Sequence, residues 1–157
     1  MSIDCGSCAP FHSRVEQHYN VLLHRYGFSP VECSADRNGR ECTLMYESSR
    51  CRLVFIRSDG AKSCTIGSLE TPFPGNTLLH TRGEQGWYHA ITLIEWKSGK
   101  KLLTARLIDE VHDGKRNYLA WEAQHVAQWA NQLFELFAPG KSRQWQDDFA
   151  QFAHTGR

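Results

Sequence analysis

The stretch ECTLMYESSRCRLVFIRSDGAKSCTIGS, residues 41–68, decides the fold of this chain. Short apolar runs alternate in it with turn-forming pairs, and Cys51, Leu53 and Phe55 recur at every second position. This period of two is typical of a half-buried strand. Consecutive strands joined by tight turns pair antiparallel, because a parallel crossover needs about a dozen residues or more. The sequence therefore predicts a meander of short strands over about 31–69, with the clearest strands over 41–47 and 50–57 and a further strand over 62–68.

Helices are predicted on both sides of this meander. Before it, apolar residues recur at steps of three and four over 10–26, which is the pattern of one helix face. After it, Asn117 is suited to cap a helix whose apolar stripe runs from Leu119 to Phe137, and a last short helix follows Ser142. The segment 87–97 fits a helix or a strand, and we interpret it as a helix. The segment 102–111 stays undecided.

The order helix, strands, helices predicts an α+β fold. It has an N-terminal helix, an antiparallel strand meander and C-terminal helices packed on one side of the sheet. The 157 residues match one ordinary domain, and the hydrophobic and charged contents of 41% and 22% are those of a globular chain. We expect a single domain over 1–157, in which residues 1–9 form a flexible tail.

The net charge and the hydropathy of the chain indicate which classes of partner are not expected. The 18 Lys and Arg nearly balance the 17 Asp and Glu, for a net charge of +1. Such a balance is not typical of a nucleic-acid binder or of a polybasic membrane-surface protein. The chain has no apolar run long enough for a membrane span, and its first residues lack the features of a secretory signal. We therefore expect neither nucleic acid nor membrane as partner, a cytoplasmic location and six reduced cysteines.

The motif Cys5-Gly-Ser-Cys8 raises two chemical alternatives. In thioredoxin-like enzymes such a pair follows a strand, but only four residues precede Cys5 here. A zinc site would use Cys5, Cys8 and His12, which lies one helical turn further on, with Cys33 or Cys42 as the fourth ligand. The remaining two cysteines, Cys51 and Cys64, are interpreted as core residues, because free cysteine behaves as a small buried hydrophobe.

Other catalytic patterns are missing from the sequence. It contains neither a Gly-x-Ser-x-Gly nucleophile elbow nor a glycine-rich phosphate loop. The acidic residues at 109, 110 and 113 are interpreted as part of a solvated turn rather than as a calcium site. The sequence leaves enzymatic activity undecided, with the balance against it.

Aromatic residues give the one hint of a binding surface. Trp121 and Trp129 lie two turns apart on the predicted C-terminal helix, offset from its apolar stripe. Because tryptophan is enriched at binding hot spots, both are candidate partner-binding residues. The alternative is that they belong to a wide core face covered by the last helix.

The order of segments resembles a group of small, mostly uncharacterised bacterial α+β proteins. The likeness is carried by five short motifs, which are Tyr26-Gly27-Phe28, Met45-Tyr46-Glu47-Ser48, Arg50-Cys51-Arg52-Leu53-Val54-Phe55, Ile66-Gly67-Ser68-Leu69 and Leu136-Phe137-Ala138-Pro139. Some such proteins are immunity-like, so the resemblance implies a non-enzymatic protein-binding module that neutralises a toxin-like partner. The alternatives are a zinc- or thiol-dependent protein that uses Cys5 and Cys8, and a structural homodimer subunit.

Overall fold

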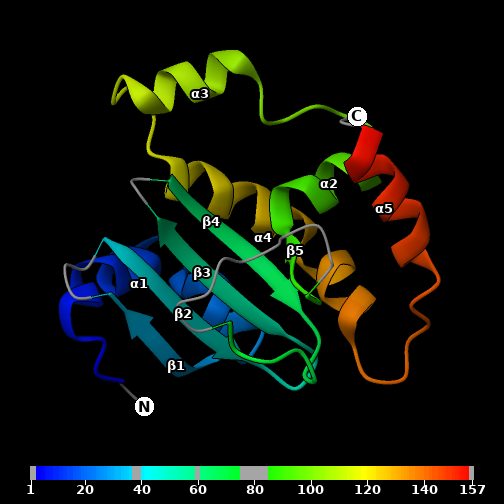
Figure 1. Ribbon diagram of the computed structural model, residues 1–157, viewed down its shortest axis with the longest axis horizontal. Coiled ribbons are helices and arrows are strands. Elements are labelled where there is room, and N and C mark those ends of the chain that lie inside the picture. Colours follow the sequence, from blue (N-terminus) through cyan, green and yellow to red (C-terminus); the bar gives the residue numbers. More distant parts are fainter. Residues whose placement is uncertain (1–2, 37–39, 59–60, 75–84, 156–157) are drawn as a thin grey trace.

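The computed structural model describes residues 3–36, 40–58, 61–74 and 85–155, and it confirms the α+β fold (Figure 1). A single sheet has the strand order β1-β2-β3-β4-β5, and all neighbouring strands are antiparallel. Its strands are β1 (Ser29–Ala35), β2 (Glu41–Glu47), β3 (Arg52–Ser58), β4 (Ala61–Gly67) and β5 (Tyr88–His89). The helices are a 3₁₀ turn (Gly6–Cys8), α1 (Ala9–Arg25), α2 (Ala90–Ser98), α3 (Ala105–His112), α4 (Tyr118–Phe137) and α5 (Trp145–Thr155).

The predicted meander is present with nearly the predicted bounds. β2 and β3 pair from Glu41 opposite Ser58 to Glu47 opposite Arg52 without a break. The period of two places Leu53 and Phe55 fully buried on one face, as predicted for a half-buried strand. The central residues of the turns at 37–39 and 59–60 lie outside the described residues. β1 was not singled out in the sequence.

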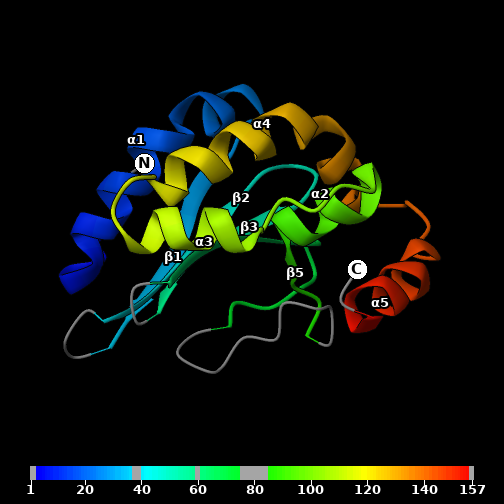
Figure 2. The same ribbon diagram turned by 90° about the horizontal axis from the view of Figure 1, so that it is seen from above.

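Two helices cover one face of the sheet. Figure 2 shows α1 and α4 side by side above the strands, with α2 continuing this layer. Between helices and sheet lies the main core, in which the ring of Tyr19 packs edge-on against Phe55 at 4.6 Å. On the opposite face of the sheet a smaller apolar cluster consists of Met45, Val54 and Trp87. α1, α2 and α4 thus form one layer on one face of the sheet, which agrees with the predicted α+β arrangement.

The segment 87–97 contains both alternatives that its sequence allowed. Tyr88 and His89 form the short strand β5 beside β4, and α2 begins at the next residue. The side chain of His89 caps this helix by accepting a hydrogen bond from the Thr92 N–H at 3.3 Å. The helix interpretation is therefore right from Ala90 onward, and it missed the two residues that pair with β4.

The last helix packs on the end of this layer rather than on the sheet. α4 ends before Ala138-Pro139-Gly140, as predicted, and the Arg143 guanidinium donates to the Phe137 carbonyl oxygen at 2.9 Å. A cation at this position satisfies the free carbonyls of a helix end. α5 then brings Trp145 and Phe149 against Tyr88 and Trp96, with ring centroids 5.1–5.9 Å apart.

A glycine at the end of β4 makes room for the aromatic side chain of the smaller cluster. A Cβ atom at Gly67 would lie 2.9 Å from ring carbons of Trp87 and 3.0 Å from the Gly86 carbonyl oxygen. We expect Gly67→Ala to lower the free energy of unfolding by about 1–3 kcal/mol, because the buried ring must shift. Urea denaturation followed by tryptophan fluorescence measures this effect. An unchanged midpoint would show that Trp87 yields without cost.

None of the described helices is long and apolar enough to cross a membrane.

Candidate functional site

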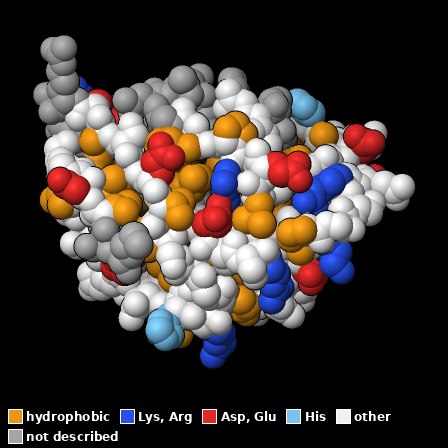
Figure 3. Space-filling view, turned by 90° about the horizontal axis from the view of Figure 1, so that it is seen from below, with side chains coloured by type: hydrophobic (Ala, Val, Ile, Leu, Met, Phe, Trp, Pro, Cys, Tyr) orange, Lys and Arg blue, Asp and Glu red, His pale blue; other side chains and the backbone are white. Residues whose placement is uncertain are grey.

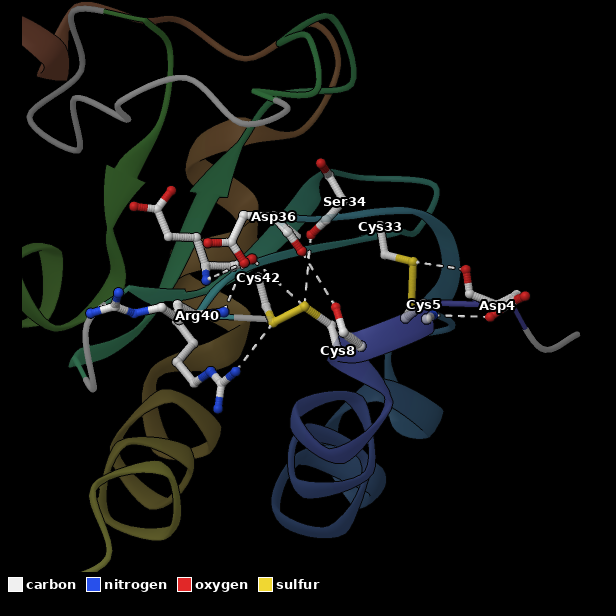
Figure 4. The surroundings of a disulfide bond; sticks show 12 residues. Asp4, Cys5, Cys8, Cys33, Ser34, Asp36, Arg40 and Cys42 are labelled. Atoms are coloured by element: carbon white, nitrogen blue, oxygen red, sulfur yellow. Dashed lines mark hydrogen bonds between the residues drawn. A yellow bond between two sulfur atoms is a disulfide. The ribbon is translucent and has the colours of Figure 1, made fainter. Parts of the chain in front are cut away.

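Two disulfides fasten the start of α1 to the first two strands (Figure 4). Cys5 bonds to Cys33 of β1, and Cys8 bonds to Cys42 of β2. The Cα–Cα distances are 5.7 and 5.8 Å, which is the usual separation in a disulfide. The prediction of six reduced cysteines is therefore wrong for four of them. It failed because the bonded cysteines are about 30 residues apart, so that only the folded sheet brings them together.

The predicted tail at residues 1–9 also needs correction. Residues 1 and 2 lie outside the described residues, but Gly6–Cys8 form a 3₁₀ turn and α1 begins at Ala9. The side chains of Cys5 and Cys8 are buried in the core cluster. A segment that is bonded covalently to two strands and buried at both bonds is part of the fold.

The zinc alternative is contradicted by the same geometry. Sulfur atoms in a disulfide are not thiolates, and zinc binds the thiolate. His12 lies 3.7 Å from a carboxylate oxygen of Glu16, on the next turn of α1. Within the described residues, no group of three or more His, Cys, Asp or Glu side chains is arranged to hold a metal ion. Cys5, Cys8 and His12 thus do not form the predicted ligand set.

The two remaining cysteines lie in the core, as predicted. Burial raises the pKa of the Cys51 thiol to about 12 and raises the pKa of the Cys64 thiol well above its usual range. A buried thiol that stays protonated is a poor nucleophile. Neither residue has the exposed, electropositive surroundings of a reactive cysteine.

The two candidate tryptophans sit on α4 with one side against the core. Trp121 and Trp129 are both half-buried and pack against the main core cluster. Trp121 lies between the rings of Tyr118 and His125, at centroid distances of 5.5 and 4.7 Å. Part of each indole is therefore used in packing, and their partner-binding role stays a prediction.

The undecided segment 102–111 contains the feature that sequence reasoning did not find. It forms α3, which lies apart from the main helix layer (Figure 1). Thr104 caps it by accepting a hydrogen bond from the Leu107 N–H at 3.1 Å. Leu107 is the one fully buried residue within this helix. Ile108 keeps 57% of its surface exposed. Among the aliphatic residues of α3, Leu107 is thus buried, Val111 is half-buried and Ile108 is exposed.

Both ends of α3 are held by carboxylates. Before it, the buried Glu95 accepts hydrogen bonds from the backbone N–H groups of Leu102 at 2.7 Å and Leu103 at 2.9 Å. At its other end, Glu110 forms ion pairs with Arg106 at 3.2 Å and Arg116 at 2.9 Å. Hydrogen bonds from the Arg116 and Arg106 guanidinium groups, together with their positive charges, lower the pKa of the Glu110 carboxyl group. The segment before α3 is therefore held by a buried carboxylate, and the end of the helix by exposed ion pairs, while Ile108 stays exposed.

Beneath α3 lies a cleft of about 440 Å³. α3, the end of the β3–β4 hairpin, the second turn of α1 and the beginning of α4 enclose it. Its walls are mainly aliphatic, from Leu103, Leu107, Ile108, Val111 and Leu119. The polar lining comes from Arg14, Lys62, Arg116, Asn117 and Tyr118, with Ala61 completing the wall. We call this hollow the α3 cleft. Its size is in the range of ligand and anchor sites in proteins.

The charge of the α3 cleft is positive. Arg14 and Lys62 form no ion pair with any acidic residue in the described parts of the chain, whereas Arg116 is paired with Glu110. Burial, and then the neighbouring charges of Arg14 and Arg57, lower the pKa of Lys62. The like charges of Arg14 and Lys62, which have no acidic partner among the described residues, favour the binding of an anion. On the side of the molecule opposite α3, acidic and basic side chains are instead interspersed (Figure 3).

A buried carboxyl group lies next to the lining of the cleft. Glu122 of α4 accepts hydrogen bonds from the Tyr19 hydroxyl at 2.6 Å and from the Cys64 N–H at 2.9 Å, and Tyr118 lies close enough to influence its pKa. Burial nevertheless outweighs these donors and raises its pKa to about 7. The same burial raises the pKa of both tyrosines. Tyr118 therefore lines the cleft and lies near the buried carboxyl group of Glu122.

A second, smaller hollow of about 280 Å³ lies between α1 and the edge of the sheet. There the Tyr46 hydroxyl donates a hydrogen bond to Glu16, which also faces His12. The pKa of Tyr46 is raised by burial and by this carboxylate, so the phenol stays protonated. The Tyr46 hydroxyl and the Glu16 carboxylate thus satisfy each other, and His12 lies 3.7 Å from the same carboxylate.

The residues of the α3 cleft carried one signal in the sequence. Leu103, Leu107 and Val111 recur at steps of four, which is a helical period. The residues 109, 110 and 113 obscured it, because an acidic cluster near Gly114 also fits a turn. Glu110 in fact binds two arginines, one of them after the helix. Arg14 and Lys62 are separated by 48 positions in sequence, and only the fold brings them to one site.

Comparison of the chain with protein-family models, with curated proteins and with solved structures gives no match.

Proposed function

We propose that the chain is a non-enzymatic binding protein that holds a segment of a partner protein in the α3 cleft. The observation that carries the proposal is the exposed Ile108 of α3 at a cleft with aliphatic walls. Exposed aliphatic surface in a groove costs free energy in water and is characteristic of interaction sites. Peptide-binding grooves of this type take up apolar side chains of a partner segment.

The fixed ends of α3 support this function. A helix whose flanking segments are held by Glu95 and Glu110 does not have to be ordered when the partner binds. Preorganisation of this kind lowers the entropic cost of association. A binding role also explains why α3 is part of the fold although Leu107 is its one buried residue.

The proposal agrees with the action that the resemblance to immunity-like proteins implies, namely the neutralisation of a toxin-like partner. Within the described residues, the buried thiols and the cluster of His12, Glu16 and Tyr46 supply no obvious catalytic group. A protein that acts by occupying a surface of its partner needs none.

A photo-cross-linking amino acid at position 108 tests the proposal. Ile108 lines the cleft, whereas Val21 on α1 is 73% exposed and does not line it, so position 21 is the matched control. In cells that naturally produce the protein, we expect a discrete protein adduct from position 108 and not from position 21. The measurement is the mass of the adducts on a denaturing gel and by mass spectrometry. Equal adducts from both positions, or none from position 108, would contradict the proposed function.

A further inference from the structure

We propose that the partner segment held in the α3 cleft is acidic, with carboxylates that contact Arg14 and Lys62 and aliphatic side chains that pack under α3. This inference rests on the proposed function and adds the chemistry of the partner. It is carried by two separate properties of one hollow, which are its aliphatic walls and the two cations without an acidic partner among the described residues.

The position of the two cations favours an anion that enters from outside. Arg14 comes from α1 and Lys62 from β4, and both line the cleft together with aliphatic residues of α3. Lys62 stands opposite Arg57 in the β3–β4 pair, so three basic side chains meet near one end of the hairpin. The only acidic group on α3 that reaches a cleft residue, Glu110, is already bound to Arg116 and Arg106. Within the described residues, the positive charges of Arg14 and Lys62 thus have no acidic partner.

The perturbed lysine agrees with this geometry. Burial and the charges of Arg14 and Arg57 lower the pKa of Lys62, so the protonated form of this lysine is destabilised in the unliganded protein. A carboxylate between Arg14 and Lys62 would remove much of this repulsion. A charged hydrogen bond to such a group is shorter and stronger than a neutral one.

The walls of the cleft favour a protein segment over a nucleic acid. Single-stranded nucleic acids are held by aromatic side chains on which bases stack. The lining residues include one aromatic side chain, Tyr118, and five leucine, isoleucine or valine side chains. The net charge of +1 also lacks the large excess that phosphate backbones require. Aliphatic side chains flanked by Asp or Glu in a polypeptide match both properties.

Three fluorescein-labelled peptides that differ only in charge test the inference. The probes alternate Leu with Glu, with Gln or with Lys, and their binding is followed by fluorescence anisotropy at low salt. We expect the affinity order acidic, neutral, basic, and a loss of acidic-peptide affinity of roughly 10-fold to 100-fold in the Arg14→Glu/Lys62→Glu variant. The control variant Arg25→Glu/Lys100→Glu changes the net charge equally at exposed positions outside the cleft. It should keep the order and most of the affinity.

The outcomes separate the two proposals. If the three peptides bind equally, or if both variants lose affinity equally, the acidic partner is wrong while the cleft can still be a protein-binding site. If no peptide binds and position 108 gives no adduct, the proposed function itself is wrong. Tighter binding of a single-stranded oligonucleotide or of inorganic phosphate, lost in Arg14→Glu/Lys62→Glu, would overturn the inference in favour of a phosphate ligand. Circular dichroism confirms that each variant is folded.

Discussion

Reduction of the two disulfides is expected to lower the free energy of unfolding by about 4–6 kcal/mol, the largest effect that we predict for this protein. The bonds close loops with sequence separations of 28 and 34 residues, and each such loop restricts the unfolded chain by about 3–4 kcal/mol. The two loops overlap from Cys8 to Cys33, so their contributions do not add fully. The start of α1 is the element that loses its attachment.

Thiol counting and denaturation measure this effect. Protein purified without reductant and alkylated in denaturant should take up two alkyl groups, on Cys51 and Cys64, and six after reduction. Urea unfolding with and without a dithiol reductant then gives the change in stability. The Cys51→Ala variant, which keeps both bonds, serves as the control and should retain the response to reductant. Six alkylated thiols before reduction would contradict the disulfide assignment.

The second large effect concerns the contribution of Glu122 to the pH dependence of stability, which Glu122→Gln removes. Folding raises the pKa of Glu122 to about 7, so the folded state binds a proton more tightly than the unfolded state does. Stability from this group is therefore complete below the unfolded pKa near 4.5 and is lost as the pH rises through 7. Between pH 5 and pH 8 this loss amounts to about 2 kcal/mol.

Urea unfolding of the wild type and of Glu122→Gln at pH 5 and pH 8 measures the difference. The glutamine variant should gain stability relative to the wild type by about 2 kcal/mol on going from pH 5 to pH 8. Burial of His89, whose pKa falls to about 4, adds an opposite pH dependence that both proteins share, so it cancels in the comparison. A stability difference that does not vary with pH would show that Glu122 stays ionised throughout.

The fold could be predicted where local pattern and tertiary burial agree. The stripe from Leu119 to Phe137 is buried as its helical period requires, and Asn117 caps α4 by accepting the Ala120 N–H at 3.0 Å. β2 to β4 follow from the period of two and the turn pairs. The two-residue strand β5 is too short to leave any period in the sequence. Its pairing with β4 depends on contacts made only in the folded chain.

The candidate site could not be predicted from local sequence patterns, because it is formed by contacts between residues that lie far apart in the sequence. The cysteines at 5 and 8 fitted a metal or redox motif by spacing, but their bonds go to β1 and β2. The helical period of 103–111 was present, yet a helix with one fully buried residue gives a weak stripe. In the sequence, Arg14 is one charged position on a predicted helix, and only the fold places it in the same cleft as Lys62.

Identification of the partner peptide that cross-links to position 108 tests the central claim most directly. The adduct is digested, and tandem mass spectrometry locates the partner residue joined to the cleft. The account predicts a single partner protein and a contact peptide in which Asp or Glu flank aliphatic residues, with a yield that falls in Arg14→Glu/Lys62→Glu but not in Arg25→Glu/Lys100→Glu. A basic contact peptide, a non-protein adduct, or the same peptide from position 21 would contradict it.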